Sequence, residues 1–440
     1  MKCLEDYIKR HGEKQPDKVA VVVGGQAITY GELCTLMDER VEELRSEGVN
    51  CGQVVCFRNT QDLDFLLTYF ALHVMGAVAL PLESDISDDK MHEIAKCYES
   101  FVPPCDVADI LFTTGTTGQS KGVMVSHATI LVNGENLIAA HGFTADHVFI
   151  INGPLNHIGS LSKIYPVMMQ GGTLYLLESM KDLNAFFAAL DYPCKKVATF
   201  MVPTSARILL QLAKKRLGSY SHKIDFIETG AAPMPHADML ALCELLPHSR
   251  LFNTYASTET GIISTYNFND GRCLSGCLGK AMKHSSFHIT DSGQVACQGK
   301  TLMVGYAAEM ERTREVLRDG VLYTADNGFI DEEGMLHLTG RNDDVINVGG
   351  FKISPTEVED VALSHPNIKD CICIGVISPI TGHALKLLYV SHDGEEINKR
   401  DIARFINAKL ERHKVPLLYE RVDEVKRTFN GKLDRKGYHE

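Results

Sequence analysis

The feature that most constrains the fold is a regular alternation of short apolar runs with helical stretches between the N-terminus and Gly261. The runs are rich in Val, Ile, Leu and Phe, and the stretches between them have the apolar spacing of helices. This alternation predicts βαβ units around a parallel sheet. Helices are expected over residues 31–47 and 61–74, and strands over residues 19–23, 53–57, 77–82, 109–114, 147–153, 172–179, 197–203, 225–230 and 250–255.

The pattern changes after Gly261, where short strands and frequent glycines predict a small antiparallel barrel or meander. From Asp343 onward a compact α+β unit is expected. Its predicted helices cover residues 355–364 and 398–410, and its predicted strands cover residues 371–377 and 385–392.

Charge also divides the chain. The net charge is −12, yet residues 341–440 carry 16 basic and 16 acidic residues, so the preceding part carries the whole excess. A neutral segment behind an acidic body indicates a boundary near Arg341. We therefore expect two domains, residues 1–342 and residues 343–440.

Composition argues against several classes of function. A charge of −12 speaks against binding of DNA or RNA through their phosphates. The 13 cysteines lack zinc-finger spacing, and MKCLEDYIKR lacks the apolar region of a secretory signal, which predicts reduced thiols and a cytoplasmic location. Residues 65–82 contain no Asp, Glu, Lys or Arg, but His73, Gly76 and Pro81 interrupt them, so a buried helix and strand are expected rather than a membrane span.

The strongest local signal is LFTTGTTGQSKG at residues 111–122, a predicted strand followed by a loop rich in Gly and Thr. Such a loop can direct backbone N–H groups and hydroxyls at phosphate oxygens, and its lysine adds a positive charge. The spacing does not fit a Walker A loop, and a flexible surface hairpin is the alternative. The candidate phosphate-binding residues are Thr113, Thr114, Gly115, Thr116, Thr117, Gly118 and Lys121.

Four other segments carry candidate chemistry. YASTETG at 255–261 offers Tyr255 for base stacking and Glu259 as an Mg²⁺ ligand, or it is an ordinary polar turn. Asp326 suits ribose hydroxyls, although carboxylates in solvated turns are common. A Gly349-Gly350 turn precedes a helix that begins with proline, and Lys432 follows a glycine in what could also be a solvated basic tail.

Together these segments resemble the adenylate-forming superfamily, which includes acyl- and aryl-CoA synthetases, luciferases and the adenylation domains of peptide synthetases. The resemblance covers nearly the whole chain, and its motifs occur in the family's order: TYGEL, GAVALPL, TTGTTGQSKG, PLNHIGS, TGAAP, YASTE, GRND and NGKLDR. It implies an α/β fold with a large N-terminal domain of α/β sheets plus a small β-barrel, followed by a small mobile α+β C-terminal domain.

The chain departs from the family pattern at several positions. Departures within or beside the motifs are Ser120, Ala256, Gln294, Ala325, Asn347 and Lys426. The segment between Pro81 and Thr113 is also shorter than in most relatives, which implies a trimmed second sheet.

The resemblance implies an AMP-forming acid–thiol ligase that uses ATP, Mg²⁺ and coenzyme A on a small-molecule carboxylic acid. In the first step the acid attacks the α-phosphate of ATP, and in the second a thiol displaces AMP. Catalytic roles fall on Lys432, Glu259, Thr258 and His157, with Glu259 near Mg²⁺. The implied nucleotide contacts are Ala231, Ala232, Pro233, Tyr255, Asp326 and Arg341.

The resemblance also assigns the hinge and the acyl pocket. Asp343 is the implied hinge, about which the C-terminal domain turns to bring Gly349 and Gly350 to the site for the thiol step. The residues expected at the pocket are Asn156, Ser160, Leu161, Ile164, Thr229 and Gly230. They mix apolar and polar groups, which suits an aryl or medium-length acyl acid.

The thiol acceptor leaves alternatives open. VGGFKISPTEVE resembles the loop of CoA ligases, which makes free CoA the first choice. Loading of a separate acyl carrier protein is the second enzymatic hypothesis. A nucleotide- or acyl-binding relative that has lost turnover is the third, although both Glu259 and Lys432 are present.

We expect Lys432→Ala to slow adenylate formation by orders of magnitude, because no other cation is predicted to contact both reacting oxyanions. Thioester formation from pre-made acyl-adenylate should persist, since the rotated domain no longer presents this lysine. Measuring the two half-reactions separately checks the prediction. Equal loss in both would contradict a two-conformation mechanism.

Overall fold

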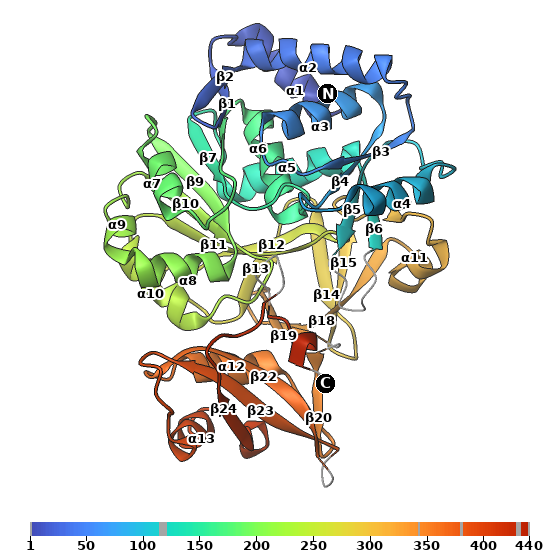
Figure 1. Cartoon of the computed structure of the whole chain (residues 1–440). Helices are drawn as coiled ribbons and strands as arrows, with labels where there is room; N and C mark the ends of the chain where they lie inside the picture. Colours follow the sequence, from blue (N-terminus) through green and yellow to red (C-terminus); the bar gives the residue numbers. More distant parts are fainter. Residues whose placement is uncertain (1, 114–120, 342–343, 379–381, 428–432, 439–440) are drawn as a thin grey trace.

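A computed structural model of the chain describes residues 2–113, 121–341, 344–378, 382–427 and 433–438 (Figure 1). Within these residues the strands form three sheets, and the expected α/β architecture is confirmed. The largest sheet has a parallel part flanked by antiparallel strands. In order, its parallel part consists of β1 (Val19–Val23), β8 (Thr173–Leu176), β7 (His147–Ile151), β9 (Lys196–Met201), β10 (Ile224–Thr229) and β11 (Arg250–Ser257).

Helices cover both faces of this parallel part. On one face, α1, α2, α3, α5 and α6 share the main apolar core; on the other, α7–α10 enclose a second one. Strands that are buried on both faces read as continuous apolar runs, which is why the sequence predicted them. The helices are α1 (Leu4–Lys14), α2 (Tyr30–Ser46), α3 (Leu63–Met75), α5 (His127–His141), α6 (Ile158–Gln170), α7 (Leu183–Asp191), α8 (Pro203–Leu212), α9 (Lys214–Gly218) and α10 (His236–Leu245).

The TYGEL motif begins α2. The Thr29 side chain accepts a hydrogen bond from the Glu32 backbone N–H at 3.2 Å, and the Glu32 carboxylate accepts one from the Thr29 backbone N–H at 2.8 Å. This reciprocal pair satisfies two N–H groups that a helix start leaves unpaired. The Tyr30 hydroxyl donates to the Gly172 carbonyl at 2.8 Å, so the motif also fixes α2 to the loop before β8.

The second sheet carries the segment that leads into the predicted phosphate loop. It contains β3 (Val54–Arg58), β4 (Val78–Leu82), β5 (Val107–Thr113), β6 (Lys121–Ser126) and β16 (Gly305–Tyr306), with α4 (Asp88–Tyr98) between β4 and β5. Every residue of β4 is buried, and α3 buries its central residues on all sides. The uncharged stretch over residues 65–82 is thus the buried helix and strand that the sequence predicts.

The antiparallel part of the largest sheet extends from β11. Its strands are β2 (Gln26–Thr29), at the opposite edge, and β12 (Gly261–Asn267), β13 (Cys277–Ala281), β19 (Leu336–Arg341), β18 (Val321–Ile330), β17 (Leu317–Arg318), β15 (Gln294–Gly299) and β14 (Ser285–Ile289). The helix α11 (Met310–Val316) lies between β16 and β17. The glycine-rich strand pattern after Gly261 therefore corresponds to antiparallel strands.

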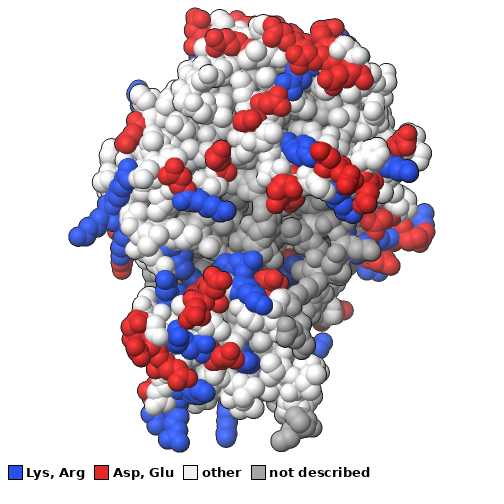
Figure 2. Space-filling model, in the orientation of Figure 1, with Lys and Arg blue, Asp and Glu red and all other residues white. Residues whose placement is uncertain are grey.

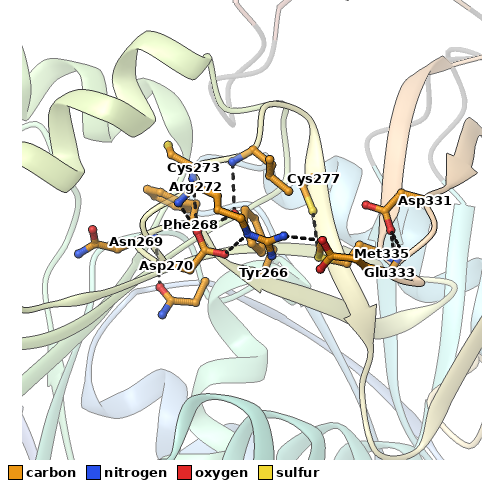
Figure 3. A network of polar contacts seen from close by, with 12 residues as sticks. Tyr266, Phe268, Asn269, Asp270, Arg272, Cys273, Cys277, Asp331, Glu333 and Met335 are labelled. Atoms are coloured by element: carbon orange, nitrogen blue, oxygen red, sulfur yellow. Dashed lines mark hydrogen bonds and ion pairs between the residues drawn. The ribbon is translucent and has the colours of Figure 1, made fainter.

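A polar network fixes the loop between β12 and β13 (Figure 3). Asp270 accepts hydrogen bonds from the Tyr266 hydroxyl and the Arg272 backbone N–H, both at 2.9 Å. The Arg272 guanidinium also lies 2.6 Å from the Glu333 carboxylate, in the turn between β18 and β19. This network ties the end of the parallel part to the strands that carry Asp326 and Arg341.

The C-terminal residues form a separate unit in Figure 1, below the rest of the molecule. Its sheet has the order β21 (Phe351–Ile353), β20 (Ile346–Val348), β23 (Gly382–Ser391) and β22 (Ile368–Ser378), and β24 (Leu418–Arg421) pairs with β23. The α-helices α12 (Pro355–Leu363) and α13 (Lys399–Asn407) bury their apolar faces in its core, and the 3-10 helices cover Arg412–Lys414 and Lys436–Tyr438. The expected α+β composition is confirmed.

Polar contacts join this unit to the N-terminal part. Asp370 at the start of β22 lies 3.2 Å from the Arg207 guanidinium on α8, and the Arg427 guanidinium donates to the Thr204 hydroxyl on α8 at 3.3 Å. The Ser275 hydroxyl donates to the Asp360 carboxylate on α12 at 3.2 Å. An interface of ion pairs and hydrogen bonds is more easily separated and re-formed than an apolar one, because its groups remain favourable in water.

All 13 cysteines are free thiols, and Cys273 and Cys277 are both buried. Among the described residues, no helix combines the length and apolarity that crossing a membrane requires.

A carboxylate ties together the amino ends of the central strands. Asp225 on β10 accepts a hydrogen bond from His147 on β7 at 2.8 Å and also contacts the Arg250 guanidinium at the start of β11. Burial alone would raise the pKa of Asp225, but the His147 hydrogen bond and the Arg250 charge outweigh it and lower the pKa to about 2.

We expect Asp225→Asn to lower the free energy of unfolding by about 1–2 kcal/mol at neutral pH. Because the pKa is depressed in the folded state, the stabilisation is complete above about pH 4 and declines as the pH falls towards 2. Urea unfolding at pH 7 and at pH 3 checks this. Asp191→Asn, at an exposed carboxylate bound to Tyr220, is the control, and an equal penalty at both pH values for Asp225→Asn would contradict the prediction.

Candidate active site

Two predicted loops leave the largest sheet at the same edge. β10 and β11 are parallel, and Thr229 pairs with Asn253, so TGAAP at 229–233 and YASTE at 255–259 both follow carboxyl strand ends. A Cβ at Gly230 would lie 3.0 Å from the Thr254 carbonyl oxygen, so only glycine fits there without displacing β11. Ala231 has a φ of +67°, a left-handed conformation that makes the turn sharp. Ala232 and Pro233 follow in the same turn.

Three of the predicted nucleotide residues converge from three strands. The Tyr255 hydroxyl on β11 donates to an Asp326 carboxylate oxygen on β18 at 2.7 Å. Arg341 at the end of β19 pairs with Asp326 in the antiparallel ladder, and its Nε lies 3.4 Å from the other carboxylate oxygen. Burial and the Asp326 charge raise the pKa of Tyr255 well above its usual value, so its hydroxyl remains a donor. This cluster offers a fixed carboxylate beside a cation, which suits ribose hydroxyls.

The residues predicted to hold phosphates and Mg²⁺ meet around one aromatic ring. The Lys121 ammonium lies 5.1 Å from the centre of the Tyr306 ring, and the Tyr306 hydroxyl donates to Glu259 Oε1 at 3.1 Å. Thr113 pairs with Lys121 across β5 and β6. Thr114, Gly115, Thr116, Thr117 and Gly118 lie outside the described residues. Tyr306, on the short strand β16, was not predicted as a site residue.

A backbone hydrogen bond fixes the position of Glu259. Its carbonyl oxygen accepts a hydrogen bond from the Met303 N–H at 2.8 Å, and the side chains of Thr258 and Glu259 are both half-buried. Tyr306 occupies one oxygen of the Glu259 carboxylate. Carboxylate oxygens are the ligands that Mg²⁺ prefers, and Mg²⁺ is usually held by one or two carboxylates together with substrate phosphates. A carboxylate and a lysine that both contact Tyr306 therefore fit an Mg²⁺–triphosphate group.

The predicted acyl side contains a polar cluster that the sequence only partly indicated. His157 is the N-cap residue of α6, and its Nε2 lies 3.6 Å from a Glu83 carboxylate oxygen. The Asn59 side chain donates to the Asn156 side-chain oxygen at 3.1 Å. Burial raises the pKa of Glu83, and a hydrogen bond with Asn156 partly opposes this rise. Glu83 and Asn59 were missed because they follow strands of the other sheet.

Of the remaining predicted pocket residues, Ser160 is buried in the first turn of α6, and the Thr229 hydroxyl donates to the Phe252 carbonyl at 3.1 Å. Leu161 and Ile164 are fully buried in the main apolar core. They support α6 from within the core.

A buried ion pair lies close to this pocket region. The Lys163 ammonium on α6 is 2.7 Å from a Glu228 carboxylate oxygen on β10 and 4.9 Å from the centre of the Phe200 ring. A Cβ at Gly159 or at Gly230 would lie 3.2 or 3.4 Å from that ring. Phe200 therefore fills the space between α6 and the TGAAP turn. The sequence analysis did not predict this pair. The signal that would have indicated it is a lysine and a glutamate inside otherwise apolar elements.

In the C-terminal unit, Gly349 and Gly350 form an exposed two-residue turn between β20 and β21, with φ values of +57° and +92°. The Asn347 side chain accepts a hydrogen bond from the Gly350 N–H at 3.0 Å. A Cβ at Gly350 would meet open space. Within the described part of the chain, no hydrogen bond or ion pair links this turn to Tyr255 or Asp326.

Asp343 and Lys432 lie outside the described residues, but the segments on both sides of Lys432 are anchored. Arg427 contacts Asp370, and Arg435 contacts both carboxylate oxygens of the buried Glu359, one of them at 2.9 Å. The Arg435 charge opposes the rise that burial causes in the pKa of Glu359. These contacts tie the C-terminal tail to α12 and β22.

The family model described as AMP-binding enzyme matches residues 8–102 and 95–307, and the model described as AMP-binding enzyme C-terminal domain matches residues 357–432. The chain is 26% identical to a feruloyl-CoA synthase of Amycolatopsis sp, with 98% of this chain and 97% of the relative covered. It is 25% identical to the 2-succinylbenzoate–CoA ligase of Bacillus anthracis, with 99% and 98% covered.

Among solved structures, ATP-bound MatB from Rhodopseudomonas palustris superposes with a TM-score of 0.86 at 24% identity, covering 98% of this chain and 97% of that one. At that identity the likeness shows the fold.

We expect Asp326→Asn to weaken AMP binding about tenfold or more, because a charge-assisted hydrogen bond contributes about 1.5–3 kcal/mol. Isothermal titration with AMP measures the change. Asp331→Asn is the matched control, since Asp331 lies in the turn after the same strand and binds His337 at 2.8 Å. Equal affinity in the wild type and in Asp326→Asn would remove Asp326 from the nucleotide site.

Proposed function

The chain belongs to the family of AMP-binding enzymes, and we propose that it activates an organic acid with ATP and transfers the acyl group to coenzyme A. The observation that carries this proposal is a pair of polar groups linked by the segment 255–259: one joins Tyr255, Asp326 and Arg341, and the other joins Lys121, Tyr306 and Glu259. The similarity to acid–CoA ligases over 98–99% of the chain supports it.

The first step joins two anions. A carboxylate oxygen of the acid attacks the α-phosphorus of ATP, the bond to the β-phosphate breaks, and pyrophosphate leaves with the electron pair. Because both partners are negative, catalysis depends on positioning and on neutralising charge. Lys121 offsets the β- and γ-phosphates, Thr258 contacts the α-phosphate, and Lys432 bridges the acid and the α-phosphate.

The nucleoside is held on the opposite side. Asp326 accepts hydrogen bonds from the ribose hydroxyls, Arg341 fixes that carboxylate, and Tyr255 packs beside the adenine at the TGAAP turn. Glu259 is the residue that would hold Mg²⁺, which supplies charge neutralisation at the phosphates when bound. Tyr306 orients the Glu259 carboxylate by its hydrogen bond.

In the second step the thiol sulfur attacks the acyl carbonyl carbon, the acyl–phosphate bond breaks, the thiol proton is lost to a base or solvent, and AMP leaves. We propose that residues 343–440 turn about Asp343 between the steps. The polar interface of Arg207, Asp370 and Arg427 supports such a rearrangement, because its ion pairs can exchange for water. This rotation of the C-terminal residues brings Gly349 and Gly350 beside the pantetheine arm, where only glycine allows the backbone to approach so closely.

The pocket near His157 suits an aryl or medium-length acyl acid. The Phe200 ring lies beside Gly159 and Gly230, and the buried Ser160 and Asn156 supply polar groups in the same region. The names of the relatives, which include feruloyl and 2-succinylbenzoate, support an aromatic acid. The 13 free thiols suit a reducing compartment, so we place the reaction in the cytoplasm. An acyl carrier protein is the alternative thiol acceptor, since it delivers the same arm.

The test is an assay of the purified chain with ATP, Mg²⁺ and a panel of carboxylic acids, with and without CoA. We expect acid-dependent pyrophosphate release for at least one aryl or medium-length acid, and acyl-CoA when CoA is added. Lys121→Ala should raise the KM for ATP about tenfold or more, through loss of a charge-assisted contact.

Three outcomes separate the alternatives. Loading of a phosphopantetheinylated carrier protein, with no acyl-CoA at millimolar CoA, would replace the CoA ligase assignment by the carrier-loading one. AMP binding without pyrophosphate release for any acid would indicate a relative that has lost turnover. An unchanged KM for ATP in Lys121→Ala would remove Lys121 from the phosphate site.

A further inference from the structure

A second polar cluster lies inside the N-terminal part, on the side chains of α1, α3, β5 and α5. His73 on α3 lies 2.9 Å from the Glu5 carboxylate through Nδ1 and 2.9 Å from the Asp109 carboxylate through Nε2. The Tyr69 hydroxyl donates to the second Asp109 oxygen at 3.0 Å. Glu5, His73 and Asp109 have at most 4% of their surface exposed.

Hydrogen bonds within the cluster leave two buried atoms without a partner. Glu5 Oε2 and His127 Nδ1 are both enclosed and bind no hydrogen-bonding group among the described residues. The His127 ring lies edge-on to His73, with ring centres 5.0 Å apart. One donor atom each from Glu5, His73 and His127 lies within 4.8 Å of the other two. A buried carboxylate oxygen and a buried imidazole nitrogen without partners, on residues whose donor atoms lie this close together, are each stabilised by a cation or a donor.

The charges of the buried carboxylates also favour a bound cation. Two buried carboxylates face His73, and a single imidazolium would leave one negative charge without compensation. The described residues provide no lysine or arginine ion pair to Glu5 or Asp109. A divalent cation bound to neutral imidazoles would balance both carboxylates.

We propose that Glu5, His73 and His127 bind a zinc-class divalent cation, with Asp109 as the partner that orients His73. Two imidazole nitrogens and one carboxylate oxygen form a ligand set typical of zinc rather than of Mg²⁺ or Ca²⁺. Asp109 accepts the proton on His73 Nε2, and the metal would lie between Nδ1 and the Glu5 carboxylate, replacing their present 2.9 Å contact, as in carboxylate–histidine–metal triads.

Metal binding requires the donor atoms to move closer together. Zinc–ligand bonds of about 2.0–2.1 Å at tetrahedral angles place donor atoms about 3.4 Å apart, so the present maximum of 4.8 Å must shrink. His127 is half-buried and the first residue of α5, so its ring can turn inward, and water can supply the fourth ligand. The metal would join α1 to α3 and α5 behind β5, the strand that leads into the predicted phosphate loop.

The test measures metal content and affinity in the tag-free full chain, independently of any enzymatic activity. We expect about one zinc per chain after gel filtration, and a rise in Tm when zinc is added to the chelator-treated protein. Glu5→Gln and His127→Ala should abolish both. Asp109→Asn should weaken zinc binding about 10–100-fold, as expected for a residue that orients a ligand.

His284→Gln is the matched control, because His284 is a half-buried histidine 2.7 Å from the Glu135 carboxylate. It should keep the zinc. Wild-type protein that binds no zinc at micromolar concentration would overturn the proposal and leave a protonated His73 between two carboxylates. Unchanged affinity in either ligand variant would overturn it as well, since exposed thiols such as Cys51 and Cys97 would then hold the metal.

If circular dichroism shows that the two ligand variants are unfolded, the cobalt spectrum of the wild type decides. Visible bands of tetrahedral cobalt without a thiolate charge-transfer band support the Glu–His–His set. Thiolate bands, or the absence of tetrahedral bands, would overturn it.

Discussion

Parallel pairing of β9, β10 and β11 brings two distant loops to one edge of the largest sheet. Because Thr229 lies opposite Asn253, TGAAP and YASTE start at the same level, and Asp225 fixes the other ends of the strands through His147 and Arg250. A shift of register by one residue would turn Glu228 away from Lys163 and place Thr229 in the apolar core. The register of this sheet therefore sets both the site and the core.

Buried charge contributes to this specification. The Lys163–Glu228 pair and the Glu5–His73–Asp109 cluster both lie within the helices and strands that surround the main apolar core. Removing one partner of such a pair leaves an uncompensated charge, which costs about 3–5 kcal/mol, although a fully apolar replacement can be neutral. By that principle, stability of the core alone is weak grounds for a buried ion pair. Each cluster instead fixes where α3 or α6 sits relative to a particular strand.

Sequence patterns predicted most of the fold, and the family resemblance grouped three residues that the structure brings into contact. The strands 19–23 and 225–230 and the helix 31–47 are all close to their observed bounds, because burial on both faces gives continuous apolar runs. Tyr255, Asp326 and Arg341 were expected together from the family resemblance, and the structure joins them. Glu83, Phe200 and Tyr306 were missed, since their relevance depends on contacts between elements far apart in the chain. Lys432 and Asp343 remain predictions.

The negative charge of the protein affects how it binds anionic substrates. The protein carries −12, and Figure 2 shows acidic side chains gathered at the top of one face while acidic and basic side chains alternate over the C-terminal unit. ATP, CoA and an organic acid are all anions, so the long-range field of the N-terminal part opposes their approach. Screening limits that field to about 8 Å at physiological ionic strength. Under the proposed function, Lys121 and Arg341 therefore act at contact distance, and the Tyr306 ring and Asp326 contact these two cations in the structure. Binding of these anions then depends on the geometry of a few cations rather than on the overall charge of the protein.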